Sequence, residues 1–107
     1  MIKLYRLLAN GEAHEFVLSK QLLRSGTSIG ANIKEALRGQ SRPDFLAKMN
    51  IALKEASESE YWIELLMESE YITGEAAETL LMDCRELIKM LTSIVKSTKD
   101  SIALSNR

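Results

Sequence analysis

Apolar residues recur every three or four positions along most of the chain, which is the spacing of one face of an α-helix. The first such segment runs only from Ile2 to about Ala9 and meets the turn signal Asn10-Gly11. The second runs from about Ala13 to Arg38, with one face formed by Leu18, Leu22, Ser25, Ile29, Asn32 and Ala36. The pattern predicts a short helix, or the end of a longer helix that this chain lacks, followed by a long helix.

Two further helices are predicted. The third begins at Ser41-Arg-Pro-Asp44, because serine caps free amides, proline fits the first turn and aspartate suits the positive end of the helix dipole. Its inner face is Phe45, Met49, Ala52, Ala56, Ser59, Ile63 and Leu66. It ends near Tyr71, and Gly74 marks the break before the fourth helix.

The fourth helix carries two apolar stripes side by side. The first is Ala77, Leu80, Cys84, Leu87, Leu91, Ile94 and Thr98, and the second is Leu81, Ile88, Val95 and Ile102. A face this wide is expected to bury against more than one neighbour.

Connections of a few residues make consecutive helices pack antiparallel. One proline and five glycines in 107 residues favour helix over β-structure, and this length suits one hydrophobic core. We therefore predict a single all-α domain over residues 1–107, an antiparallel up-down-up-down four-helix bundle with a short first helix. No apolar run is long enough to cross a bilayer and no signal peptide is evident, so we expect a cytoplasmic protein without membrane contact.

No group of side chains resembles an active site. His14, the one histidine, has no nucleophile placed by a motif, and the di-iron bundles need two Glu-x-x-His pairs, which the chain lacks. The single Cys84 lies on an apolar stripe, where a thiol behaves as a small hydrophobe. We expect no catalytic residue, no metal and no cofactor, and a protein that is not an enzyme.

Small and polar residues mark the second helix. Gly26 and Gly30 lie one turn apart, each at a cost of about 1 kcal/mol relative to alanine, and we expect them to allow close packing against another helix. A polar strip beside the apolar face consists of Ser25, Ser28, Asn32 and Glu35, with Glu55, Glu58 and Ser59 of the third helix as candidate partners. A satisfied network of this kind would fix the register of the two helices.

Charge is segregated along the chain although the net charge is only −1. The basic residues Lys20, Arg24, Lys34 and Arg38 trace one face of the second helix, and Arg42 follows. This stripe is the candidate site for RNA or DNA. Because the chain has no net positive charge, a solvated face or salt bridges to an acidic neighbour is favoured over nucleic-acid binding. In a symmetric ring, a third interpretation is that the stripe meets the acidic third helix of the next subunit.

Three stretches carry a family resemblance: Gln21-Leu-Leu-Arg-Ser-Gly-Thr-Ser-Ile-Gly-Ala-Asn-Ile-Lys-Glu-Ala36, Ser41-Arg-Pro-Asp-Phe45 and Lys54-Glu-Ala-Ser-Glu-Ser-Glu-Tyr-Trp62. They resemble the bacterial four-helix-bundle proteins encoded in intervening sequences of large-subunit ribosomal RNA genes, a family related to accessory proteins of diversity-generating retroelements. The resemblance implies a ring-like homopentamer and assigns packing and register roles to Ser28, Asn32, Glu35 and Glu58. The short first helix and the slightly negative net charge depart from the pattern.

Together these observations predict a non-enzymatic, homo-oligomeric, pentameric bundle that acts as a scaffold or an RNA-associated factor. The alternative is a nucleic-acid-binding accessory protein that uses the basic stripe of the second helix.

Overall fold

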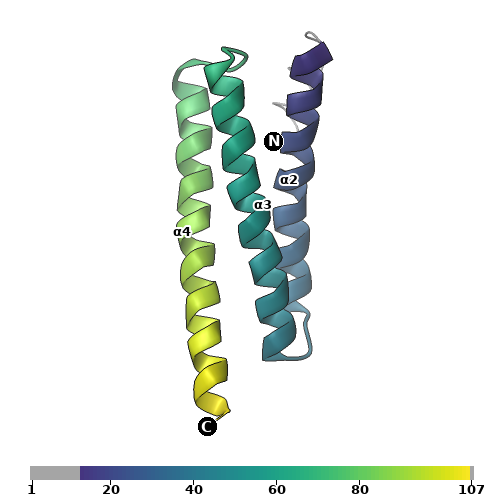
Figure 1. Ribbon diagram of the computed structural model, residues 1–107, viewed down its shortest axis with the longest axis vertical. Helices are drawn as coiled ribbons and strands as arrows, with labels where there is room; N and C mark the ends of the chain where they lie inside the picture. Colours follow the sequence, from purple (N-terminus) through teal and green to yellow (C-terminus); the bar gives the residue numbers. More distant parts are fainter. Residues whose placement is uncertain (1–12, 107) are drawn as a thin grey trace.

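Three long helices run up and down beside one another in the computed structural model (Figure 1). They are α2 (Ala13–Leu37), α3 (Arg42–Glu68) and α4 (Gly74–Ser105). The structure describes residues 13–106, with side chains from Glu15 onward, so the side chain of His14 lies outside it. The all-α prediction and the antiparallel packing of consecutive helices are confirmed, and the helix limits fall within about three residues of those expected.

The prediction of a four-helix bundle is wrong, because three helices make up the described part of the chain. The predicted first helix, from Ile2 to about Ala9, lies outside the described residues. That expectation rested on eight residues, fewer than the roughly 12 to 15 that an isolated helix needs to be stable in water.

The two connections follow from local sequence. The Ser41 hydroxyl accepts a hydrogen bond from the Asp44 backbone N–H at 3.2 Å, and Pro43 occupies the first turn of α3. After α3 the chain turns sharply: the Tyr71 backbone N–H donates to the Leu66 carbonyl at 3.0 Å, and Glu70 has a φ of 62°. Gly74 has a φ of 76°, a conformation that glycine adopts without steric cost.

Helix α3 packs against both α2 and α4 and supplies more buried apolar residues than either of them. The buried residues of α3 are Met49, Ala52, Ala56, Ser59, Ile63 and Leu66, which match the predicted inner face. One apolar cluster joins Ile29 and Ala36 of α2 to Leu91 and Val95 of α4 across the small residues Ala52 and Ala56. A second cluster, at the other end of the molecule, contains Leu22, Ile63, Leu66 and Cys84.

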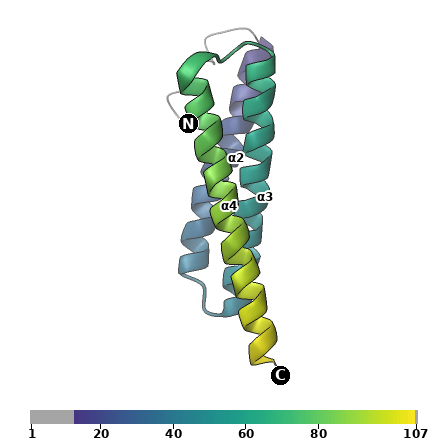
Figure 2. The ribbon, with the colours of Figure 1, turned by 90° about the vertical axis from the view of Figure 1, so that its left-hand side faces the viewer.

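Helices α2 and α4 run in the same direction on either side of α3, and no Cα atoms of these two helices approach within 8 Å. Figure 2 shows α4 in front of α2, with α3 beside both. The wide apolar face of α4 therefore has one helical neighbour among the described residues, whereas the sequence predicted more than one. Met90 and Leu104 of α4 keep 59% and 64% of their surface exposed.

No described helix combines the length and the apolar character that crossing a bilayer requires.

Candidate interaction surfaces

Ion pairs lie along one edge of the contact between α2 and α3. Arg24 of α2 forms ion pairs with Glu55, at 3.3 Å, and with Glu58 of α3. Glu58 also accepts a hydrogen bond from the Trp62 indole Nε1 at 3.3 Å. Arg24 therefore lies against the acidic helix of its own chain, and its charge is already compensated there.

A second set of ion pairs lies along the edge of the contact between α3 and α4. Arg85 of α4 donates to Glu60 at 2.9 Å and to Glu64 at 3.4 Å. The hydrogen bond to Glu60, with a smaller one to Glu64, raises the pKa of the Arg85 guanidinium. Within the described chain, α3 therefore pairs four of its carboxylates with arginines of its two neighbours.

The five residues of the predicted basic stripe have different surroundings. Arg24 is paired with α3, and Arg42 donates a hydrogen bond to the Ser101 hydroxyl of α4. The other three, Lys20, Lys34 and Arg38, are exposed, and the structure gives them no ion pair within residues 13–106. They remain together on the side of α2 that points away from α3.

The residues of the predicted polar network are distributed over separate contacts. Asn32 donates to the backbone carbonyl of Ser28 at 2.9 Å and to its hydroxyl at 3.1 Å, both within α2. Glu35 pairs with Lys48 at 2.9 Å, and Glu58 belongs to the Arg24 group. The buried polar contact between α2 and α3 is the hydroxyl pair Ser25 and Ser59, 2.7 Å apart, which joins the predicted strip to one of its candidate partners.

Several acidic residues of α4 were missed as site candidates, because the sequence analysis attributed the acidic surface to the third helix. Asp83, Glu86 and Asp100 are exposed, with no ion pair in the part of the chain that is described. The signal was present in the sequence. Asp83 directly precedes Cys84, which places it roughly 100° round the helix from that buried thiol.

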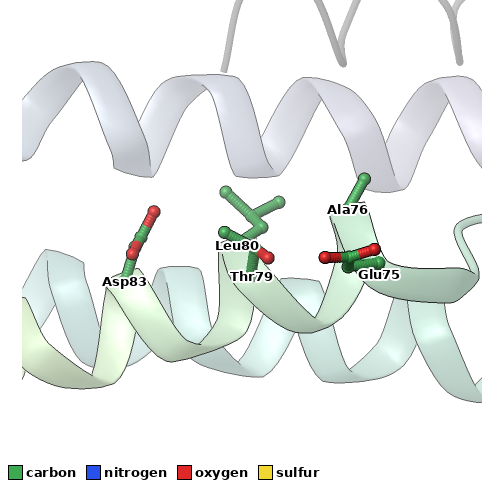
Figure 3. Close-up of a pocket in the computed structure, with 5 residues that line it drawn as sticks. All are labelled: Glu75, Ala76, Thr79, Leu80 and Asp83. Atoms are coloured by element: carbon green, nitrogen blue, oxygen red, sulfur yellow. The ribbon is translucent and has the colours of Figure 1, made fainter.

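A shallow, open hollow lies on α4 beside these acids, lined by Glu75, Ala76, Thr79, Leu80 and Asp83. In Figure 3, Ala76, Leu80 and Asp83 project from α4 into the space between this helix and α2. Every described lining residue comes from α4.

The Cys84 thiol is part of the core. It is buried and donates to the Ala56 carbonyl at 3.4 Å, and burial, with a further effect of Glu60, raises its pKa to about 11. A thiol with such a pKa is protonated and unreactive at neutral pH. No group of three or more His, Cys, Asp or Glu residues in the described chain is placed to hold a metal ion.

The fold defines a class, that of elongated all-α proteins built from antiparallel helices. Within it, the chain belongs to the family of 23S rRNA-intervening sequence proteins, which it matches over residues 1–93. Among solved structures it is similar to a protein of unknown function from the S23 ribosomal protein family of Bacteroides thetaiotaomicron VPI-5482. The two are 60% identical with a TM-score of 0.82, covering 89% of this chain and 87% of that one. No curated protein matches the chain.

Proposed function

We propose that this protein is a non-enzymatic, homo-oligomeric helical protein that acts as a scaffold or an RNA-associated factor. The proposal rests on one observation: part of the apolar face of α4 is not packed against another described helix. Its apolar face is two stripes wide, but α3 is its single helical neighbour within residues 13–106. Exposed apolar surface of this kind, bordered by charged residues, is typical of a protein–protein contact.

The half-buried residues of α4 show where that cover is missing. Cys84, Leu91 and Val95 are buried against α3. Leu80, Leu87 and Ile94 lie further round the helix and are only partly buried, and Met90 is exposed. Covering this row by association would remove apolar area from water, which stabilises a complex by about 25 cal/mol per Å² before the cost of association is subtracted.

Solution mass tests the proposal. Light scattering in low and moderate salt, with and without a short structured RNA, should give a mass of several chains that moderate salt does not reduce. The family resemblance sets the expected number at five. A chain that stays monomeric at all concentrations tested would contradict the proposal.

The alternative is a nucleic-acid-binding accessory protein, as the resemblance to the retroelement proteins suggests. It is supported by Lys20, Lys34 and Arg38, which are exposed and without ion pairs in the described chain. Phosphate contacts of this kind release counterions, so binding should weaken as salt rises. A double variant, Lys34→Ala with Arg38→Ala, should then weaken RNA binding. Unchanged affinity would remove α2 as the binding surface, and Lys54→Ala on the outer side of α3 is the matched control.

A further inference from the structure

We infer that the outer stripe of α2 in one copy of the chain docks on the acidic stripe of α4 in a second copy. This inference rests on the proposed homo-oligomer and names the two surfaces that form its contact. Four properties of the described helices support it: the position of the stripes, their residue types, their charges and the separation of α2 from α4.

The α2 stripe consists of Leu23, Gly30 and Leu37, which repeat at steps of seven residues. Each directly follows one of the buried residues Leu22, Ile29 and Ala36, and so lies roughly 100° further round the helix from the face that contacts α3. Leu37 is 72% exposed, and a Cβ placed on Gly30 would meet no heavy atom within 4 Å. This glycine does not serve the close intramolecular packing that the sequence suggested, and its side of the helix has room for a neighbouring side chain.

The α4 stripe consists of Asp83, Met90, Ser97 and Leu104, also at steps of seven. Asp83 and Met90 directly precede the buried Cys84 and Leu91, so this stripe is turned roughly 100° from the α3 contact in the opposite sense. Residues that repeat every seven positions form one continuous seam, which is how two helices pack over many turns. Both stripes therefore have the geometry of a helix–helix contact.

The charges beside the two stripes are opposite. Lys20 lies three residues from Leu23 and Lys34 four residues from Gly30, both on the outer side of the α2 stripe, and Arg38 continues that side. Glu86 and Asp100 lie beside the α4 stripe, which itself contains Asp83. Lys89 lies three residues from Glu86 and Lys96 four residues from Asp100, so these two lysines border the α4 stripe on its outer side, while Asp83 has no lysine at either spacing. None of the three cations of α2 and none of these three acids has an ion pair among the described residues.

The two stripes of one chain cannot pack on each other as the helices stand. Helices in contact have axes about 8 to 10 Å apart, but no Cα atom of α2 lies within 8 Å of one in α4. A second copy offers each stripe its complement, and it does so through two different surfaces of the same chain. Such a heterologous contact repeats from copy to copy, and the angle between copies decides whether it closes into a ring.

Charge reversal in the full chain tests this contact. The variant Lys20→Glu with Lys34→Glu makes the α2 stripe acidic, and Asp83→Lys with Glu86→Lys makes the α4 stripe basic. Each double variant should raise the dissociation constant of the oligomer about tenfold or more in low salt, measured by sedimentation velocity. The quadruple variant restores opposite charges on the two surfaces of one chain, so it should recover the affinity. Lys54→Glu with Glu68→Lys, on the outer side of α3, is the control, and circular dichroism checks the helix content of every variant.

The possible outcomes distinguish a failure of the proposed homo-oligomer from a failure of the two docking surfaces alone. If the unmodified chain is a monomer, both the proposed function and the docking surfaces are wrong. If it is an oligomer whose affinity survives either reversal, or if the quadruple variant fails to recover it while keeping its helices, the docking surfaces alone are wrong.

Discussion

The hydroxyl oxygens of Ser25 and Ser59 lie 2.7 Å apart in the fully buried contact between α2 and α3. Each hydroxyl also lies within hydrogen-bonding distance of a carbonyl of its own helix, Leu22 at 3.3 Å and Glu55 at 2.9 Å. Two small side chains allow the helices to approach closely here, and their hydrogen bond ties one register of α2 to one register of α3.

Removing one of these hydroxyls should destabilise the protein modestly. Ser25→Ala or Ser59→Ala is expected to lower the free energy of unfolding by about 1 kcal/mol, because a buried hydroxyl loses its partner. The double variant should cost less than the sum of the two, since no unpaired group remains. Urea unfolding of the three variants measures this, and strict additivity would show that the two hydroxyls do not interact.

The ion pairs of Arg24 should contribute little and depend on salt. The Arg24 side chain is 49% exposed, and exposed pairs are worth about 0 to 1 kcal/mol. Arg24→Met keeps most of the aliphatic stem while it removes the charge, so it should reduce stability in low salt and much less in about 1 M salt, where charges are screened. An equal loss at both salt concentrations would mean that packing, not charge, is what Arg24 supplies.

Gly30 and Gly74 should respond to alanine in opposite directions. Gly30→Ala is expected to raise the free energy of unfolding by about 0.5 to 1 kcal/mol, because Gly30 lies inside a helix and has open space around it. Gly74→Ala should lower it by about 1 to 2 kcal/mol, because the φ of 76° is costly for any residue with a Cβ. Thermal unfolding of both variants, at a concentration low enough for the chains to be dissociated, compares them, and a loss of stability in Gly30→Ala under those conditions would contradict the open space beside Gly30 within the single chain.

The buried thiol should give stability a dependence on pH in the alkaline range. Cys84 has a pKa of about 11 in the folded chain, against 9.0 for an unperturbed thiol. The folded state therefore keeps its proton between about pH 9 and pH 11 while the unfolded state loses it, so the contribution of this group is complete below pH 9 and is lost as pH rises to 11. Cys84→Ala should flatten that part of the profile. Rapid labelling of the native thiol at neutral pH would contradict its burial.

The sequence predicted the long helices well because their signals are local. The spacing of Met49, Ala52 and Ala56, the Ser41 cap and the break at Gly74 each depend on neighbouring residues alone, and the structure has the helices at those positions. The number of helices was predicted wrongly, since the proposed first helix, Ile2 to about Ala9, rested on a segment of only eight residues.

The candidate surfaces were harder to predict, because charge compensation depends on which helices meet. The sequence placed Arg24 on a basic stripe, with salt bridges to an acidic neighbour as one interpretation, and assigned the acidic surface to the third helix. The packing instead brings Arg24 to Glu55 and Glu58 and Arg85 to Glu60, so the acids left exposed and without ion pairs within residues 13–106 include Asp83 and Glu86 of α4. Which charged side chains of two helices meet depends on how far each helix is rotated about its own axis. The spacing of residues along the chain does not give that rotation.

The central claim is that the uncovered face of α4 is closed by further copies of the chain. Sedimentation equilibrium of the unmodified protein over a wide concentration range tests it most directly, against a chain mass of 12.0 kDa. A mass of several chains that persists in moderate salt is the predicted result. A mass of one chain at every concentration would contradict the claim.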